Sequence, residues 1–521
     1  MSPSADVRAA IRGVLAAILF LGVLAPAAPL GAQEKSDSPV FKKYRPPAGP
    51  PLVESSDALY QMWQTFIITR KANAGDVLAQ HELSIRYLLG RGAAADTVRA
   101  AYWMRRAAEA DYVPAMFNYA IMCYNGWGVS WDPFEAYRLF RASALKKMPE
   151  AEYAMGQFLT EDLVVPRNFD SAYVWLRKAA GEGYGPAKEA LARLEREGIG
   201  PGHADSAKQA AVKAPNTGLV FLDFPQDEEP VSGDSLLLKE AIQSASPSLR
   251  KALGLSKLLD AESPADSTTI AALLRAGDAG SPEALTVLAR SYERGVGVSR
   301  DPVRACALYV RAIRLDSPRA PELLLKLLEQ KGTLPHLKAE AGKGEPAAEF
   351  AWAGLSALGF DAALAQAQVY LSGDEAFHLL EKAGDRGYTP ALVEEGLAYY
   401  AGRWVPRNME KAMDIWTRAA SLGSKDAMVR IALTTLRAPA DTSGRKEAVQ
   451  ILGKAAEEGS VLAEVGLGYC YETGTGVPRK NAEAAYYYRA ASMRGSQDAF
   501  RALRRMHDAI RPDSPEFRLA D

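Results

Sequence analysis

The sequence is poor in the residues that build most catalytic and metal sites. Its 521 residues include three cysteines and five histidines. The cysteines are Cys123, Cys306 and Cys470, and an odd, widely spaced set of this kind predicts neither a disulfide framework nor a metal cluster. Each lies inside a helical pattern, where other segments carry small or aromatic residues. We therefore expect three buried structural thiols.

Excess charge and long apolar runs are also lacking. The chain has 62 basic and 63 acidic residues, a net charge of −1. No overall field would attract a polyanion, so we do not expect nucleic acid as a partner. Beyond residue 32, no stretch is long and apolar enough to cross a membrane.

The known catalytic motifs are incomplete. His81 and Glu82 begin a zinc-binding His-Glu-x-x-His pattern, but Ile85 stands where the second histidine would be. Ser143 and Ser248 each begin a Ser-x-x-Lys sequence, without the further elements that serine acylation needs. We therefore predict no metal, no cofactor and no enzymatic activity.

The N-terminus has the features of an export signal. Arg8 and Arg12 precede an apolar stretch at 13–25, and small residues follow up to Ala32, after which cleavage is expected. The segment contains no cysteine, so a lipid anchor is not expected. The interpretation is an exported chain, periplasmic where the cell has an outer membrane. The alternative is that the segment stays as an uncleaved anchor.

A spacing of 36 residues organises most of the remaining chain. Small residues recur at this step in three series: Ala79, Ala115, Ala151 and Ala187; then Ser248, Ala284 and Ala320; then Ala391, Ala427, Ala463 and Ala499. Bulky residues follow four and eight positions after most of these anchors, which places them on one helix face. A helix therefore begins near each anchor.

Glycine pairs follow the anchors at eleven and thirteen residues and predict the end of the first helix. Examples are Gly90 with Gly92 and Gly474 with Gly476. Glycine allows the positive φ that a chain reversal needs. Aspartate or asparagine then begins a second helix, as at Asp132. Such hairpins bury their faces only by stacking on one another.

The spacing breaks twice and divides the chain. Between Ala187 and Ser248 about 25 residues are added, and they form either an inserted loop or a hinge. Between Ala320 and Ala391, Ala348 is an anchor out of phase, so one hairpin should be short and the next long. The predicted parts are a signal peptide (1–32), a disordered leader (33–56), an N-terminal repeat array (57–212), the insertion (213–235), a C-terminal repeat array (236–510) and a tail (511–521).

The stretch Ser460 to Gly495 resembles the Sel-one-like repeat family, which is related to the tetratricopeptide repeats. The first half of the family motif is matched by Ala463, Leu467, Gly468, Tyr471, Gly474, Gly476 and Val477. The second half is matched by Trp175 to Ala180 and by Lys411, Ala412 and Trp416. The step of 36 also fits this family better than the tetratricopeptide step of about 34.

The resemblance implies the fold and the class of function. It implies an all-α, right-handed superhelical solenoid of about 12 helix-turn-helix repeats, interrupted by the inserted loop. Family members act as adaptors that present a concave groove to proteins. One branch is linked to penicillin binding and has a disulfide in each repeat. The paired cysteines of that branch are missing here, so penicillin binding is not implied.

The first helix of such a repeat lines the concave face, which predicts a partner-binding surface. The groove positions of the N-terminal array are apolar for the most part: His81, Ile85, Leu88, Phe117, Ile121, Tyr124, Tyr153 and Gln157. Those near the C-terminus include Val393, Leu397 and Tyr400, whereas the middle of the chain has a polar stretch of Thr286, Arg290, Glu293 and Arg294. The alternative is that tight curvature buries the apolar positions between neighbouring helices.

Tryptophans in the turns are a second candidate surface. Trp127, Trp131 and Trp404 either contact a partner or cover the ends of hairpins. We expect an exported, non-enzymatic scaffold that binds a protein or peptide. The alternative is a protein that binds or remodels the cell wall, with the turn tryptophans stacked on sugars.

Overall fold

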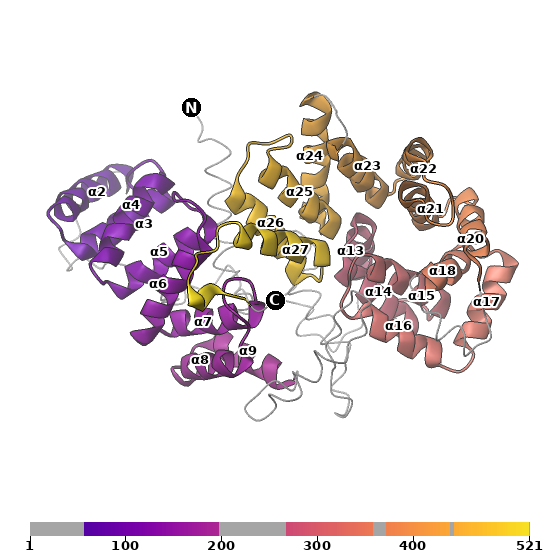
Figure 1. Cartoon of the computed structure of the whole chain (residues 1–521), viewed down its shortest axis with the longest axis horizontal. Helices are drawn as coiled ribbons and strands as arrows, with labels where there is room; N and C mark the ends of the chain where they lie inside the picture. The colour runs from indigo at the N-terminus through magenta and orange to yellow at the C-terminus, as the bar shows by residue number, and fades with distance from the viewer. Residues whose placement is uncertain (1–56, 197–266, 358–370, 438–441, 520–521) are drawn as a thin grey trace. The chain divides into compact units, whose positions relative to one another are not determined.

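The structure of the chain is a computed structural model, which describes residues 57–196, 267–357, 371–437 and 442–519. These residues form helices joined by turns, and no strand occurs among them (Figure 1). The predicted signal peptide, leader and insertion, with the anchor Ser248, lie outside the described residues. The chain divides into two compact units, one of residues 1–228 with 504–521 and one of residues 229–503.

The first unit, called unit 1, contains the helices of the N-terminal array and the C-terminal segment from Arg504. Its helices are α2 (Asp57–Asn73), α3 (Val77–Leu89), α4 (Thr97–Glu109), α5 (Val113–Asn125), α6 (Pro133–Leu145), α7 (Pro149–Glu161), α8 (Phe169–Gly181) and α9 (Gly185–Arg196). Sequential helices pack against one another, so the unit is a stack of hairpins.

The second unit, called unit 2, contains the C-terminal array. Its helices are α13 (Ser267–Ala279), α14 (Pro282–Arg294), α15 (Pro302–Arg314), α16 (Ala320–Glu329), α17 (Thr333–Lys343), α18 (Pro346–Ala357), α20 (Gly373–Asp385), α21 (Thr389–Ala401), α22 (Met409–Ser421), α23 (Lys425–Arg437), α24 (Thr442–Glu458), α25 (Val461–Thr473) and α26 (Asn481–Met493). The division between the units falls inside α27 (Gln497–Asp508), whose last residues belong to unit 1.

The anchor residues lie inside the helix packing. Every described alanine anchor is buried, from 7% exposed at Ala79 to 0% at Ala427 and Ala499. The predicted short hairpin is observed, since α16 and α17 have 10 and 11 residues, and Ala348 is fully buried in α18. The predicted long hairpin that follows includes residues 358–370, which lie outside the described residues. The helical solenoid that the spacing predicted is therefore confirmed.

The helix ends follow the predicted chemistry. Asp96 and Asp132 accept hydrogen bonds from backbone N–H groups of the helices that they begin, Asp96 from Arg99 N and Asp132 from Glu135 N, both at 2.9 Å. Such capping satisfies donors that have no partner in the helix. Gly90 and Gly92 end α3 with φ of +66° and +68°. The repeated glycine pair is therefore a turn, as predicted.

The two glycines of a turn differ in what surrounds them. At Gly90, an added Cβ would lie 3.4 Å from the nearest side-chain atom, which is ordinary contact. At Gly92, it would lie 2.1 Å from Gln61 O, a backbone atom of the preceding hairpin. The second glycine is needed for the close approach of two hairpins, in addition to the positive φ.

This difference predicts unequal effects of the same substitution. Gly90→Ala should cost about 1 kcal/mol, because its main effect is strain at positive φ. Gly92→Ala should cost several times more, because α2 must also move away. Urea unfolding followed by circular dichroism measures both, with Gly90→Ala as the matched control. Equal losses for the two variants would contradict the assignment.

Candidate partner-binding surfaces

The residues predicted to face a groove in unit 1 are mostly buried. Gln157 is half-buried, and the seven others are at most 8% exposed: His81, Ile85, Leu88, Phe117, Ile121, Tyr124 and Tyr153. Their contacts join consecutive hairpins. This burial matches the alternative that curvature places them between neighbouring first helices.

Aromatic and polar contacts both contribute to this junction. The ring of Tyr124 on α5 lies edge-on to Phe158 on α7, with centroids 5.5 Å apart. His81 Nε2 on α3 lies 3.0 Å from Asn118 Nδ2 on α5. Burial lowers the pKa of His81 to about 4, so its imidazole is neutral at pH 7. A role for these residues in binding a partner stays a prediction.

The turn tryptophans cover hairpin ends. Trp131 is 8% exposed, and its ring lies 5.0 Å from that of His507. Trp127 and Trp404 are half-buried and pack against hydrophobic clusters of their own units. Trp404 takes the place of the second turn glycine and has a φ of +65°. These contacts leave at most part of each ring accessible.

The predicted groove residues of unit 2 are more accessible than those of unit 1. Val393 is 3% exposed, whereas Leu397 and Tyr400 are half-buried. Tyr400 packs beside Trp416 with ring centroids 5.7 Å apart, and its hydroxyl accepts a hydrogen bond from Arg437 Nη1 at 3.0 Å. Leu397 and Tyr400 thus combine packing with some exposure.

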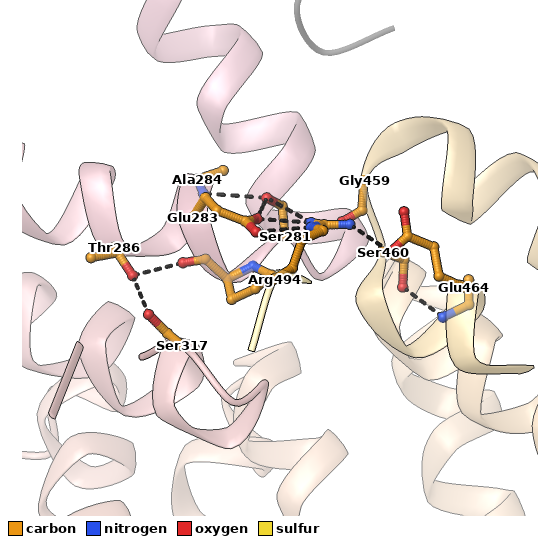
Figure 2. A network of polar contacts seen from close by, with 11 residues as sticks. Ser281, Glu283, Ala284, Thr286, Ser317, Gly459, Ser460, Glu464 and Arg494 are labelled. Carbon is orange, nitrogen blue, oxygen red and sulfur yellow. Dashed lines mark hydrogen bonds and ion pairs between the residues drawn. The ribbon is translucent and has the colours of Figure 1, made fainter. Parts of the chain in front are cut away.

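A buried arginine joins helices of unit 2 that are far apart in the sequence (Figure 2). Arg494, at the end of α26, donates to both carboxylate oxygens of Glu283 at the start of α14, each at 2.8 Å. It also donates to Glu464 Oε2 at 3.0 Å and to Gly459 O at 2.6 Å. We call Ser281, Glu283, Gly459, Glu464 and Arg494 the closure cluster.

The closure cluster lies where equivalent turns of two repeats meet. Gly280 and Gly459 both lie four residues before an anchor alanine, and Val461 N donates to Gly280 O at 3.4 Å. The next pair of equivalent positions also meets, since an added Cβ at Gly495 would lie 2.3 Å from Asp316 O. The array therefore returns to its own start in register.

A second ion pair links separate hairpins of unit 2. Arg314, at the end of α15, donates from Nε and Nη2 to the two carboxylate oxygens of Glu394 on α21, at 2.9 and 2.8 Å. Paired parallel contacts of this kind fix orientation as well as distance. Together with the closure cluster, this pair stabilises the curvature of the unit.

Electrostatics make the closure cluster sensitive to pH. Burial raises the pKa of Glu464 from its ordinary 4.5 to about 7, and the Glu283 carboxylate acts in the same direction while Arg494 opposes it. One guanidinium lies between two carboxylates and cannot neutralise both. Glu464 therefore binds a proton more readily in the folded chain than in the unfolded chain.

The C-terminal segment packs into unit 1, which the sequence did not predict. Phe517 is fully buried, with its ring 5.0 Å from that of Phe134. Arg511 donates to Leu163 O at 2.8 Å and to Val164 O at 3.0 Å. The only sequence signal was an aromatic residue in a segment assigned as a tail.

Comparison with known families identifies the repeats. A family model described as Sel1 repeat matches residues 77–112, 113–147, 149–184, 282–317, 368–388, 394–424 and 461–496. The chain therefore contains seven Sel1 repeats. Five of the matches begin and end close to helix hairpins described above, whereas 368–388 contains α20 alone among the described helices and 394–424 begins inside α21. Sel1 repeat proteins are generally protein-interaction scaffolds.

Individual relatives match only in part. The mouse (Mus musculus) protein DAP3-binding cell death enhancer 1 is 30% identical over 167 residues, which are 25% of this chain and 32% of the relative. The chain thus spans about a third of that relative's length. A protective antigen of uropathogenic Escherichia coli with an SLR fold is 21% identical, with a TM-score of 0.30, over 84% of this chain and 81% of the antigen. A Sel1 repeat protein from Oxalobacter formigenes is 23% identical, with a TM-score of 0.28, over 41% of this chain and 88% of that protein.

The chemistry-bearing side chains of the described Sel1 repeats serve packing. Burial raises the pKa of Cys123 and Cys306 to about 12 and that of Cys470 to about 11, so the thiols stay protonated at neutral pH. Ser143 is fully buried and donates to Leu139 O at 2.9 Å. Within the described ranges, no three or more His, Cys, Asp or Glu side chains are grouped as metal ligands.

Among the described helices, none combines the length and the apolar character needed to cross a membrane.

Removal of the Phe517 ring should release the C-terminal segment from unit 1. Phe517→Ala deletes a fully buried ring, a change that costs about 3–5 kcal/mol in protein cores. Residues 511–519 should then exchange their amide hydrogens faster, while α2 to α5 keep their protection. Arg518→Ala, at a side chain 68% exposed, is the control. Unchanged exchange in Phe517→Ala would contradict the packing.

The closure cluster should make unit 2 less stable as pH rises. Below pH 4.5, Glu464 is protonated in both the folded and the unfolded chain. Between 4.5 and 7, only the unfolded chain loses the proton, so stability falls through this interval and then levels off. The full difference is about 3 kcal/mol, or roughly 5 to 10 °C in melting temperature.

Calorimetry of the full chain between pH 5 and pH 8 checks this expectation. The melting temperature of Glu464→Gln should change less across the pH series than that of the wild type. Burial also raises the pKa of Glu395 to about 7, which adds a fall of the same sign to both proteins. The comparison with the wild type therefore isolates Glu464, and Glu410→Gln at an exposed position is the control. If the melting temperature of Glu464→Gln changed with pH as much as that of the wild type, the role of Glu464 would be contradicted.

Proposed function

We propose that the chain is an exported, non-enzymatic scaffold that binds a protein partner. The observation that carries the proposal is the set of seven Sel1 repeats, because this fold generally serves as a non-catalytic scaffold. The burial of the thiols and of Ser143 supports it, since these groups are engaged in packing.

The proposed export rests on the sequence of the N-terminus. The basic residues Arg8 and Arg12, the apolar stretch at 13–25 and the small residues before Gln33 have the order of a cleaved signal. A scaffold in that compartment would meet exported proteins as partners.

Helix α2 provides the strongest candidate surface for a protein partner. Three large apolar side chains of its outer face are exposed: Met62 by 58%, Trp63 by 61% and Phe66 by 62%. Within the described residues, α2 packs mainly on α3 and begins the stack. Exposed aromatic clusters of this kind are typical of interfaces, where Trp is a frequent anchor. Gln157, Leu397 and Tyr400 are the predicted groove residues that keep enough exposure to contribute.

The cell-wall alternative has no such support. Stacking on sugars requires an accessible ring face, and Trp131 is buried while Trp127 is half-buried. Protein binding is therefore the function that the described residues favour.

Site-specific photocrosslinking tests the proposal in the cell of origin. A photoreactive amino acid at Trp63 should give one discrete protein adduct in the exported fraction, and the same probe at the exposed Arg105 on α4 should not. N-terminal sequencing of the purified chain should begin at Gln33. Trp63→Ser with Phe66→Ser should reduce capture about tenfold or more, with unchanged circular dichroism.

Val98→Ser is the matched control, because Val98 is 66% exposed on another helix of the same unit. Equal adducts from Trp63 and Arg105 would overturn the proposed surface. Cosedimentation of the pure chain with peptidoglycan, without a protein adduct, would overturn the proposed class of partner. An N-terminus at Met1 would overturn export by cleavage.

A further inference from the structure

The C-terminal segment of unit 1, residues 511–517, lies on α6 in the manner of a short bound peptide. Phe517 is fully buried, and its ring lies 5.0 Å from that of Phe134. The guanidinium of Arg138 lies 5.2 Å from the centre of the Phe517 ring and pairs with Glu516 at 3.6 Å. A buried aromatic ring and an ion pair beside it thus hold one end of the segment.

An arginine holds the other end. Arg511 donates to Leu163 O at 2.8 Å and to Val164 O at 3.0 Å, both in the turn after α7. It also donates to Phe517 O at 2.8 Å, and Pro515–Phe517 form a 3₁₀ turn inside the loop that this bond closes. The segment therefore presents a guanidinium and an aromatic ring in a fixed relation, six residues apart. Such preorganisation lowers the entropic cost of binding.

The residues between these two groups contribute little buried surface. Asp513, Pro515 and Glu516 are exposed, and Pro512 and Ser514 are half-buried. The contact with unit 1 therefore depends mainly on two side chains. Few anchors of this kind, among them aromatic residues and arginine, carry most of the energy of protein interfaces.

The stack of hairpins forms without a cover of this kind. Phe134 and Arg138 stand 19 and 23 residues after the anchor Ala115. Val98 and Tyr102 have the same places on α4, in the preceding hairpin, and are 66% and 53% exposed. Helix α4 nevertheless packs on both α3 and α5. The fold thus accepts an open apolar face at these positions, so the cover on α6 is an addition to the repeat.

The turn after α7 also differs from the regular turns. In the turn after α5, Gly128 lies against the preceding hairpin, since an added Cβ would be 2.0 Å from Thr97 O. Val164 takes the place of this glycine after α7, and the carbonyl oxygens of this turn accept hydrogen bonds from Arg511. The two backbone acceptors of the site thus belong to a turn that departs from the repeat pattern.

We infer that α6 and the turn after α7 form a recognition site for a segment with an aromatic residue six positions after an arginine, and that such a segment of the protein partner displaces residues 511–517. The inference rests on the proposed scaffold function and adds the chemistry of the partner. The site offers the Phe134 ring to the aromatic residue, Arg138 to an acidic residue beside it, and two carbonyl oxygens to the arginine. Guanidinium groups bind such paired acceptors in a defined orientation.

Fluorescence anisotropy of the full chain with a labelled peptide of the sequence 509–519 tests the recognition. Phe517→Ala in the chain removes the internal ring, so this variant should bind the peptide about tenfold more tightly than the wild type, whose tethered segment competes. The same change in the peptide, or Arg511→Gln in the peptide, should weaken its binding to the variant chain about tenfold. Circular dichroism should show an unchanged helix content.

A second change in the Phe517→Ala chain locates the bound peptide. Arg138→Gln, at a side chain 47% exposed on α6, should weaken binding severalfold, because it removes the ion pair and the contact with the aromatic ring. Arg99→Gln, at a side chain 67% exposed on α4, is the matched control and should leave binding unchanged.

Amide exchange of the wild-type chain tests displacement without any variant. An isotope-labelled chain allows its own residues 511–517 to be told from the peptide by mass. Excess unlabelled peptide should make the amide hydrogens of these residues exchange faster, and the peptide with Phe517→Ala should not.

Several results would overturn the inference. Equal affinity of the peptide for the wild type and for Phe517→Ala would reject the site, and so would equal effects of Arg138→Gln and Arg99→Gln. Unchanged exchange of residues 511–517 under saturating peptide would reject displacement. A wild-type dimer that is lost in Phe517→Ala would show that the displacing segment comes from a second copy of this chain.

The outcome is distinguishable from failure of the scaffold function. A protein adduct at Trp63 without peptide binding to Phe517→Ala would leave the scaffold standing and reject the site on α6. Peptide binding at α6 without any protein adduct would keep the site and reject the scaffold.

Discussion

Every hairpin of this chain depends on a close approach between helices at one small residue. The described alanine anchors are buried, and a larger side chain at any of them would separate helices that touch. A hairpin with such a contact has an apolar face on each side, so it must be covered by the next. Stability in such an array is passed from neighbour to neighbour, and the ends of the array need their own solution.

The two units meet this need in different ways. In unit 2 the array returns to its own start, and equivalent turns around Gly280 and Gly459 pack together with Arg494 between them. In unit 1 the C-terminal segment places Phe517 and Arg511 against α6 and the end of the α7 hairpin. A buried guanidinium between two carboxylates stabilises only when its geometry is nearly complete. Arg494 satisfies this condition because Glu283 holds it through two bonds and Gly459 through a third.

The features that repeat were predictable, because each copy of the pattern supports the others. The anchors, the glycine turns, the caps and the out-of-phase Ala348 were all found from spacing. Pattern alone could not distinguish an apolar groove from an apolar junction. Phe117 and Tyr124 have the spacing of both, and only the curvature of the array decides that they are buried.

Features that depend on long-range contacts were not predictable. Arg494 and Glu283 are far apart in the chain, and nothing in either repeat marks them as partners. Trp404 illustrates how two departures from the pattern compensate. It brings a side chain where other turns have glycine, and α20 begins with Gly373, where an added Cβ would lie 2.4 Å from the Trp404 ring. Trp404 and Gly373 each depart from the repeat pattern, but the small residue at 373 leaves room for the large one at 404, and the spacing of the hairpins is kept.

In the rest of the surface, residues that pack differ from residues that can serve a partner. A side chain that fills a junction is explained by the array, as His81 and Ile85 are. The exposed rings of Trp63 and Phe66 are not explained in this way, because the helix contacts of α2 leave them outside the stack. In a fold whose regular positions are all engaged by neighbours, the positions free to serve a partner are those where one repeat departs from the others without a compensating change nearby. Trp404 has such a compensation in Gly373, whereas the outer face of α2 has none among the described residues.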